Sequence, residues 1–236
     1  MAQLVPVTDI TWRTAIVREV SHPRPRAVVL RMDVPERTEH LPGQHYVVRL
    51  TAPDGYSASR SYSLSSSPSD SLVEMYVEQL EDGEVSGYLA EVVEPGDELE
   101  VRGPIGGWFA WDGSTPAVGI GGGTGVAPLV AMLRHARDTG TGDRLRLAVS
   151  ARTMADLPYA EELVSAGAVV ALSREATSAG RTAGRLARAE LAPLVGPGVT
   201  YYLCGSTGFT EAASQLLMEL DVEPAAVRVE RFGPSG

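Results

Sequence analysis

The feature that most constrains the fold of this chain is a glycine-rich run between an apolar segment and a helix-forming segment. Residues 117–120 are apolar and of strand length, and helix formers begin at Val126. The residues between them include Gly121, Gly122, Gly123 and Gly125. A turn without side chains lets backbone N–H groups approach an anionic group at a helix start, where the helix dipole also favours negative charge. The run therefore predicts a strand, a phosphate-binding turn and a helix.

The spacing of these glycines departs from the G-x-G-x-x-G fingerprint of dinucleotide-binding folds. Gly119 and Gly121 would require a third glycine where the chain has Thr124. Pro128 suits the first turn of the helix, where its missing N–H costs nothing. A merely flexible turn is the alternative interpretation of the run.

The chain after the glycine run alternates short apolar segments with helical patterns. Apolar segments recur at 145–149, 169–172, 201–203 and 227–229, and most are separated by helical patterns at 128–137, 155–165, 185–194 and 210–220. Such alternation predicts a parallel sheet covered by helices on both faces, with ligands at the carboxyl ends of the strands.

The first part of the chain has a different pattern. Short segments rich in β-formers, divided by Pro, Gly and Asp, occupy 11–20, 27–32, 45–50, 72–78 and 98–102. They predict an antiparallel barrel or sandwich, with one helix at 86–93. A Gly- and Pro-rich linker at 103–116 then separates two expected domains, an antiparallel β-barrel at 1–110 and an α/β domain at 111–236.

Composition excludes several kinds of chemistry. All twenty basic residues are Arg, so a Walker-type phosphate loop and Schiff-base chemistry, which both need Lys, are ruled out. Cys204 is the only cysteine, so the chain provides neither an internal disulfide nor a thiolate cluster for iron–sulfur or zinc. The net charge of −10 disfavours nucleic-acid binding, and no apolar run is long enough to span a bilayer. We expect a soluble, cytoplasmic monomer without a metal.

A second motif precedes the glycine run by about sixty residues. The segment Arg60-Ser61-Tyr62-Ser63-Leu64 offers a cation, an aromatic face and a hydroxyl within five residues. A flavin followed by a nicotinamide dinucleotide explains this segment and the glycine run together.

Because it contains both motifs, the chain resembles the ferredoxin–NADP reductase family of flavoproteins, and the resemblance covers nearly its whole length. Four segments carry the resemblance in the family's order. The 60–64 segment resembles the flavin motif R-x-Y-S, and Gly83 to Ser86 resembles a second flavin-phosphate turn. Gly121 to Gly125 resembles the turn for the nicotinamide pyrophosphate, and Cys204-Gly205 resembles the pair that faces the nicotinamide.

The resemblance implies a role for each residue of the flavin motifs. Arg60 would pair with the flavin pyrophosphate, Tyr62 would lie against the isoalloxazine ring, and Ser63 would reach its N5 edge. The other residues that it places at the FAD are Leu64, Tyr76, Val77, Glu78, Gly83, Val85 and Ser86. The alternative interpretations are that Tyr62 is an ordinary aromatic residue of a strand and that Ser86 only caps a helix.

The resemblance also implies the nicotinamide site. Gly122, Gly123, Thr124 and Gly125 would hold the pyrophosphate, and Cys204 with Gly205 would shape the nicotinamide pocket. Glu230 would be a polar neighbour of the hydride path, and Phe232 would cover the flavin face. A buried, inert Cys204 and a frayed C-terminal tail are the alternatives.

Arginines after the second and third strands of the α/β domain indicate NADPH over NADH. Arg152 follows one strand, and Ser173-Arg174 follows the next and resembles the family's grip on the 2′-phosphate, with Arg181 nearby. We therefore expect a hydride from NADPH to pass to FAD, and electrons to leave for a ferredoxin, a flavodoxin or an oxygenase component. Arg24, Arg26, Arg31 and Arg37 would form a docking patch for an acidic carrier, or are scattered surface charge.

Two other functions remain open at this stage. One is an NADH-dependent reductase subunit that works only inside a larger oxygenase complex. The other is a non-redox module that binds flavin or nucleotide.

Overall fold

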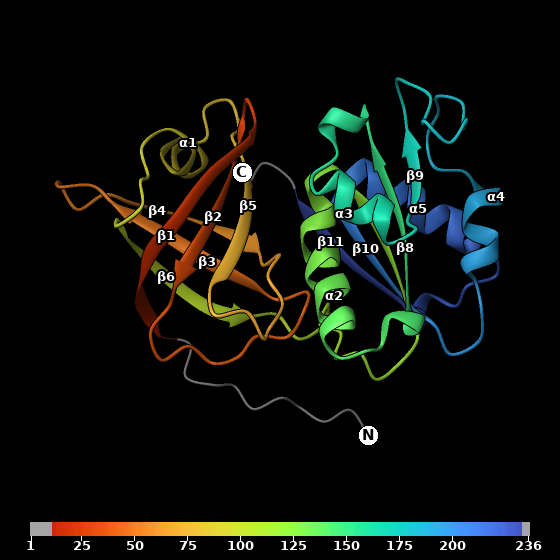
Figure 1. Ribbon diagram of the computed structural model, residues 1–236, viewed down its shortest axis with the longest axis horizontal. Coiled ribbons are helices and arrows are strands. Elements are labelled where there is room, and N and C mark those ends of the chain that lie inside the picture. The colour runs from red at the N-terminus through yellow and green to blue at the C-terminus, as the bar shows by residue number, and fades with distance from the viewer. Residues whose placement is uncertain (1–10, 233–236) are drawn as a thin grey trace. The chain divides into compact units, whose positions relative to one another are not determined.

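The computed structural model describes residues 11–232, and the chain divides into two compact units (Figure 1). The first unit comprises Met1–Ala110 and the second Trp111–Gly236. Each unit has its own sheet, antiparallel in the first and parallel in the second.

The first unit is a six-stranded antiparallel sheet in the order β4-β3-β6-β1-β2-β5. Its strands are β1 (Trp12–Arg24), β2 (Ala27–Asp33), β3 (His45–Thr51), β4 (Ser57–Ser63), β5 (Val73–Glu78) and β6 (Glu98–Ile105). A bridge between Leu64 and Met75 joins the chain at the outermost strands β4 and β5. The sheet therefore closes on itself as a barrel.

Alternating side chains fill the inside of this barrel. Val28, Leu30 and Met32 of β2 are buried at every second position, as a strand with one inward face requires. The helix α1 (Glu84–Glu91) adds Val85 and Leu89 to the same core. The barrel thus has a single apolar interior that holds β4 and α1 in place.

The second unit is a five-stranded parallel sheet in the order β11-β10-β7-β8-β9. Its strands are β7 (Ala117–Gly122), β8 (Leu145–Ala151), β9 (Val169–Leu172), β10 (Thr200–Ser206) and β11 (Val227–Phe232). The helices are α2 (Ala127–Asp138), α3 (Ala160–Ser165), α4 (Arg188–Leu191) and α5 (Thr207–Met218), with short 3₁₀ turns between elements. Because all strands run in parallel, their carboxyl ends share one edge of the sheet.

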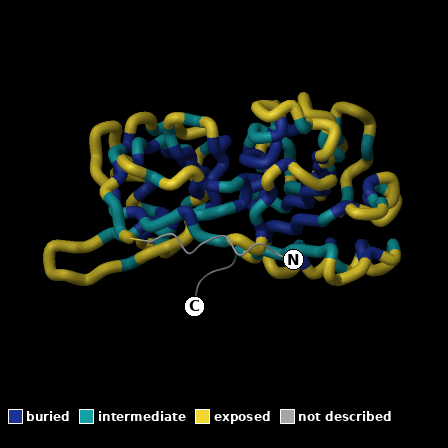
Figure 2. The backbone as a smooth tube through the Cα atoms, turned by 90° about the horizontal axis from the view of Figure 1, so that it is seen from below, coloured by how far each residue is buried: buried dark blue, intermediate teal, exposed yellow. Residues whose placement is uncertain are grey.

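The predicted fold class, an antiparallel barrel followed by a parallel α/β sheet, is confirmed. Buried residues gather inside each unit, and exposed residues lie along its peripheral loops (Figure 2). None of the helices within residues 11–232 is long and apolar enough to cross a bilayer.

The sequence pattern missed one strand and misjudged several boundaries. β4 escaped notice because four of its seven residues are Ser, and it pairs with β3 only by backbone hydrogen bonds along its length. β7 continues through Gly121 and Gly122, which pair with β8 on one side. The predicted linker overlaps β6, which extends to Ile105.

The predicted helices shift or shorten for local reasons. The helix expected at 86–93 begins at Glu84 instead, after Gly83. The helix expected at 155–165 is interrupted at Tyr159, whose left-handed φ of 54° leaves only α3 and a separate 3₁₀ turn. The helix expected at 185–194 is reduced to α4 and a 3₁₀ turn, Ala192–Leu194.

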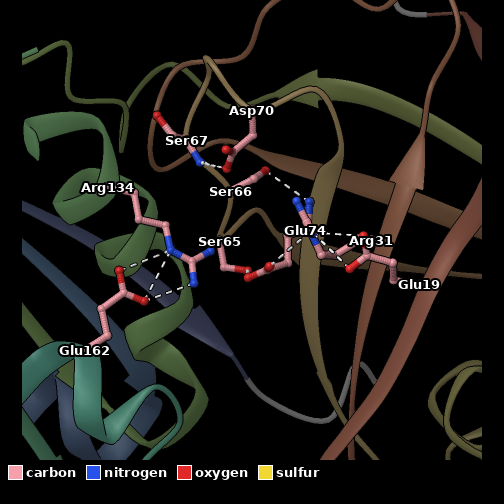
Figure 3. A network of polar contacts seen from close by, with 9 residues as sticks. All are labelled: Glu19, Arg31, Ser65, Ser66, Ser67, Asp70, Glu74, Arg134 and Glu162. Atoms are coloured by element: carbon pink, nitrogen blue, oxygen red, sulfur yellow. Dashed lines mark hydrogen bonds and ion pairs between the residues drawn. The ribbon is translucent and has the colours of Figure 1, made fainter. Parts of the chain in front are cut away.

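Glu162 fastens the short helix α3 to α2. Its carboxylate accepts hydrogen bonds from Arg134 at 3.0 Å and from Arg137 at 2.8 Å, and the Arg134 pair is drawn in Figure 3. Arg134 also lies over the ring of Tyr159, 5.1 Å from its centroid. A six-residue helix has little intrinsic stability, so these contacts with α2 help to hold it in place.

We predict that Glu162→Ala destabilises the second unit. The substitution leaves the partly buried guanidinium of Arg134 and the exposed guanidinium of Arg137 without their shared acceptor, and the loss at Arg134 costs about 1–3 kcal/mol. Chemical denaturation followed by circular dichroism measures the change. Its neighbour Glu161 is exposed, and Glu161→Ala serves as the control with an expected change within about 0.5 kcal/mol. Equal effects of the two substitutions would show that the Glu162 contacts contribute nothing.

Candidate functional site

The predicted flavin motif lies at the end of the edge strand β4. Arg60 is exposed and donates to the carbonyl of Ser59 at 2.8 Å. Burial raises the pKa of the half-buried Tyr62, whose ring packs against the barrel core. Ser63 Oγ is buried and has no hydrogen-bond partner in the part of the chain that the structure describes. A buried hydroxyl without a partner is costly, so this atom suits contact with a bound polar group.

The chain directly after the motif is fixed by a network of hydrogen bonds (Figure 3). Ser65 Oγ donates to Glu74 Oε1 at 2.9 Å, and the hydroxyl of Ser66 accepts the N–H of Glu74 at 3.0 Å. Arg31 Nε lies 3.6 Å from the other carboxylate oxygen of Glu74. All three residues 65, 66 and 74 are buried. Ser63 therefore stands at the start of a rigid segment.

The second predicted flavin segment forms the start of α1. Gly83 is the N-cap and provides no side-chain cap, so the first N–H groups of the helix have no side-chain acceptor from that position. Ser86 is not the N-cap but lies in the first turn, where its hydroxyl accepts the N–H of Leu80 at 3.1 Å and donates to the Gly83 carbonyl. A Cβ at Gly83 would overlap Ser86 Oγ, which explains the glycine.

Arg60 and the start of α1 belong to one neighbourhood. The hydroxyl of Tyr56 donates to Glu84 Oε2 at 3.0 Å, which raises the pKa of the tyrosine, and the nearby charge of Arg60 opposes this shift. A guanidinium and a helix N-terminus together favour a diphosphate.

The remaining predicted flavin residues fall into two groups, those that point into the barrel core and those that contact Arg24. Leu64, Val77 and Val85 are in the barrel core, so only their backbone is available to a ligand. Tyr76 and Glu78 are tied to Arg24, which lies 5.5 Å from the Tyr76 ring centroid and 3.3 Å from the Glu78 carboxylate.

In the second unit, the glycine turn lies directly on the end of β10. The turn is a 3₁₀ segment, Gly123–Val126, that leads into α2. A Cβ at Gly125 would overlap the carbonyl group of Cys204, so the turn reaches this position only with glycine. Two motifs almost eighty residues apart in the sequence are thus in backbone contact.

The glycines in and next to the turn have different structural roles: some allow close packing, and one leaves open space. A Cβ at Gly122 would come within 2.6 Å of the Phe209 ring, and one at Gly205 within 2.9 Å. These two glycines therefore make room for Phe209, a residue of α5 that no sequence motif indicates. Gly123 has a positive φ of 56° and nothing within 4 Å of its Cβ position. Gly123 thus remains open to a ligand at the start of the 3₁₀ turn, and the adjacent Thr124 is partly exposed.

Cys204 is a strand residue with no exposed surface. Burial raises the pKa of its thiol well above the ordinary value, and the charge of Glu230, its register partner on β11, raises it further. The thiol therefore stays protonated at neutral pH and is not a nucleophile. Burial also raises the pKa of Glu230 to about 7.

Phe232 ends β11, in register with Ser206 at the carboxyl edge of the sheet, and is partly exposed. Ser206 in turn caps α5, because its hydroxyl accepts the N–H of Phe209. The four residues Gly233 to Gly236 that follow lie outside the described residues.

The arginines predicted to bind the 2′-phosphate differ in how far their guanidinium groups are engaged by other residues. The N–H of Ser173 bonds to Ala151 and the N–H of Arg174 to Arg152, which extends the β8–β9 ladder beyond the strands. Arg152 and Arg174 are therefore neighbours, and both are exposed. Arg181 instead bonds to Glu190 and to the carbonyls of Thr182, Gly184 and Arg185. These contacts occupy its guanidinium, so Arg174 and Arg152 are the better candidates.

The arginines considered as a docking patch for an acidic carrier are largely engaged within the first unit. Arg24 pairs with Glu78, and Arg31 pairs with Glu19 at 2.9 Å. Arg37 donates to the carbonyl of Asp70. Of the four, only the Arg26 side chain forms no hydrogen bond or ion pair with another residue that the structure describes.

The residues present fit the two cofactors. The first unit offers an exposed guanidinium and an N-cap without a side-chain cap, which suit a flavin diphosphate, and the buried Ser63 hydroxyl, which suits a polar atom of the flavin ring. The second offers an open glycine turn before a twelve-residue helix, as a dinucleotide requires. Residues 11–232 contain no cluster of His, Cys, Asp or Glu that would hold a metal ion.

We predict that Gly125→Ala destabilises the second unit by about 1–3 kcal/mol, because the added Cβ forces the turn away from the Cys204 carbonyl. Denaturant unfolding measures the loss. Gly142→Ala is the matched control, since its Cβ would meet nothing within 4 Å and its φ is not positive. An unchanged stability in Gly125→Ala would contradict the contact.

We predict that the buried carboxyl of Glu230 makes stability pH-dependent. Its pKa is about 7 in the folded chain against an ordinary 4.5, so the folded state binds more protons between these values. Stability then falls as pH rises from about 4.5 to about 7, by up to about 3 kcal/mol. Glu230→Gln should remove this slope in denaturation curves at pH 5 and pH 8. A carboxyl resonance that titrates near 4.5 in NMR would contradict the account.

Sequence families match both units in the same order. Residues 16–109 match the family described as "Oxidoreductase FAD-binding domain", and residues 120–215 match "Oxidoreductase NAD-binding domain".

Relatives with a curated description are reductase components. The chain is 33% identical over 168 residues to the reductase component of propane 2-monooxygenase from Mycolicibacterium goodii, covering 69% of this chain and 46% of that protein. It is 28% identical to the ferredoxin–NAD(P)(+) reductase component of the naphthalene 1,2-dioxygenase/salicylate 5-hydroxylase systems of a Ralstonia species, covering 98% and 71%. The chain thus spans about half the length of several curated relatives that it matches.

Solved structures agree with this assignment. The crystal structure of a cytochrome P450 reductase from Amycolatopsis is 28% identical, with a TM-score of 0.81, and the similarity covers 96% of this chain and 71% of that one. The two sequence families match in order along the chain, the relatives are reductase components, and the solved structure has the same fold. These three findings agree on the family. The chain belongs to the ferredoxin–NADP reductase family of FAD-dependent oxidoreductases.

Proposed function

We propose that this chain is a reductase that oxidises NADPH through bound FAD and delivers the electrons to a separate redox protein. The observation that carries the proposal is that each unit presents a helical start with no side-chain cap beside its own binding motif, at Gly83 near Arg60 in one and at Gly122-Gly123 in the other. Residues 1–110 would bind FAD, and residues 111–236 would bind the nicotinamide dinucleotide.

In the first unit, the protein would bind and orient the flavin. Arg60 and the start of α1 would hold the diphosphate, Tyr62 would lie against the ring system, and Ser63 Oγ would meet a polar ring atom. When bound, FAD supplies the redox chemistry, because it accepts a hydride from a reduced nicotinamide and releases electrons singly or in pairs. The rigid segment after Ser63 supports this role by fixing the hydroxyl in advance.

In the second unit, the chain would align the nicotinamide. Gly123 and Thr124 would face the pyrophosphate, and Cys204 with Gly205 would close the pocket without reacting. Glu230, whose carboxyl has a pKa of about 7, would hold a proton near the nicotinamide. Phe232 would cover the flavin face until NADPH arrives. Arg174 and Arg152 would bind the 2′-phosphate, since guanidinium groups grip phosphate oxygens in a bidentate manner.

The electron acceptor would be an oxygenase component or a ferredoxin. The relatives support this choice, since their names describe reductase components of monooxygenase and dioxygenase systems. The monomeric state and the cytoplasmic location remain predictions of the sequence, and so does a flavodoxin as the acceptor.

The test compares two nicotinamides in the FAD-loaded protein with ferricyanide as electron acceptor. We predict that Arg174→Ala raises KM for NADPH by about 10- to 100-fold, because a charge-assisted hydrogen bond contributes about 1.5–3 kcal/mol. KM for NADH should stay unchanged. Arg18→Ala, which removes an exposed ion pair with Asp33, is the control and should change neither value.

Other outcomes point to the alternatives. A wild-type preference for NADH, or equal effects of Arg174→Ala on both nicotinamides, would support an NADH-dependent reductase subunit. A protein that stays colourless with added FAD and reduces nothing would support a non-redox module.

A further inference from the structure

The outer face of α1 carries apolar side chains that the barrel does not cover. Glu84, Tyr88, Glu91 and Val92 follow helical spacing, and all four are exposed, whereas Leu89 on the opposite side is buried in the core. Tyr88 is 42% exposed and Val92 53%. We call these four outward residues the α1 face. A solvated helix face is normally polar, so an exposed Tyr and Val four residues apart need a reason.

Exposed apolar side chains concentrate around this helix. Of the seven large hydrophobic residues exposed within 11–232, two lie on the α1 face and two beside it, Tyr56 and Leu80. The helix is labelled at the periphery of its unit in Figure 1, and exposed segments are yellow in Figure 2. Such clusters mark interaction sites more often than scattered single residues do.

The surroundings of the α1 face are strongly acidic. Residues 79–98 contain seven carboxylates and no Arg or Lys. All seven are exposed, and none forms an ion pair with any residue that the structure describes: Glu81, Asp82, Glu84, Glu91, Glu94, Asp97 and Glu98. Elsewhere in the first unit, carboxylates such as Glu19 and Glu100 are neutralised by arginines. Apart from Arg60 near the start of α1, the apolar centre is thus rimmed by carboxylates without ion-pair partners among the described residues.

The bound flavin does not account for the whole face. The residues that would hold its diphosphate lie at the start of α1, the end to which Tyr56 and Leu80 are joined by hydrogen bonds with Glu84 and Ser86. Tyr88 and Val92 lie about 6 Å and 12 Å further along the helix axis from Glu84, at 1.5 Å per residue. These two side chains therefore need another partner.

We propose that the α1 face is a docking surface for an electron-acceptor protein with a basic face. An aromatic and apolar centre with a charged rim is the usual anatomy of a protein interface, and the sign of the rim selects the partner. An acidic acceptor would be repelled here, and Arg24, Arg31 and Arg37 are engaged with other residues of the unit. This inference rests on the proposed reductase function.

The test uses the FAD-loaded protein and two acceptors of opposite charge. Cytochrome c is the cationic protein probe, and ferricyanide is the small anion that reports reductase activity alone. Glu94→Arg should lower kcat/KM for cytochrome c by about three- to tenfold at low salt, and this difference should vanish at high salt because the charges are screened. Val92→Ser should also lower kcat/KM for cytochrome c, and ferricyanide reduction should be unchanged in both variants.

A second experiment locates the docking surface directly. Amide NMR shifts on addition of oxidised cytochrome c should concentrate at residues 84–94.

The control makes the same charge change far from α1 in the sequence. Asp143 is exposed in a turn of the second unit, and Asp143→Arg should leave cytochrome c reduction unchanged. Equal losses in Glu94→Arg and Asp143→Arg, or no loss in either, would overturn the docking surface. So would NMR shifts confined to other elements while ferricyanide is reduced normally. Failure to reduce ferricyanide would refute the reductase function, and the docking proposal with it.

Discussion

The structure of the second unit depends on the backbone contact between Gly125 and the carbonyl of Cys204. This contact sets the turn against the end of β10 and starts α2 beside the central strand β7. Because no side chain fits between the two segments, the turn keeps its N–H groups at the carboxyl edge of the sheet. The phosphate-binding chemistry proposed for this unit follows from that placement.

In the first unit, hydrogen bonds rather than a close backbone contact hold the binding motif in place. The edge strand β4 has few apolar side chains to hold it, and the flavin motif lies at its end. The network around Glu74 and the bridge from Leu64 to Met75 fix the chain just beyond Ser63. Rigid placement of a hydroxyl next to an exposed Arg60 is what a bound flavin would need.

The sequence predicted the fold well where side-chain patterns are strong and less well where backbone contacts decide. Buried strands such as β2 and β9 stand out as apolar segments, and the alternation of strand and helix identified the parallel sheet. β4 is rich in Ser and became visible only through its pairing with β3. The left-handed backbone at Tyr159, which shortens α3, has no strong signature in a residue of that type.

The same distinction applies to the site. The motif residues Arg60, Ser63 and Gly123 can be proposed from the sequence because their chemistry is local. The packing of Phe209 onto Gly122 and the use of Arg181 as an internal brace depend on long-range contacts, which spacing does not encode. A glycine explained by packing looks the same in the sequence as one explained by a phosphate.

The central claim is that one chain holds both a flavin and a nicotinamide for hydride transfer. The most direct measurement is the visible spectrum of the FAD-loaded protein during anaerobic titration with NADPH. The account predicts that the flavin bands bleach with about one equivalent of NADPH, because a hydride carries both electrons that reduce the flavin. Flavin bands that persist in excess NADPH and in excess NADH would contradict it.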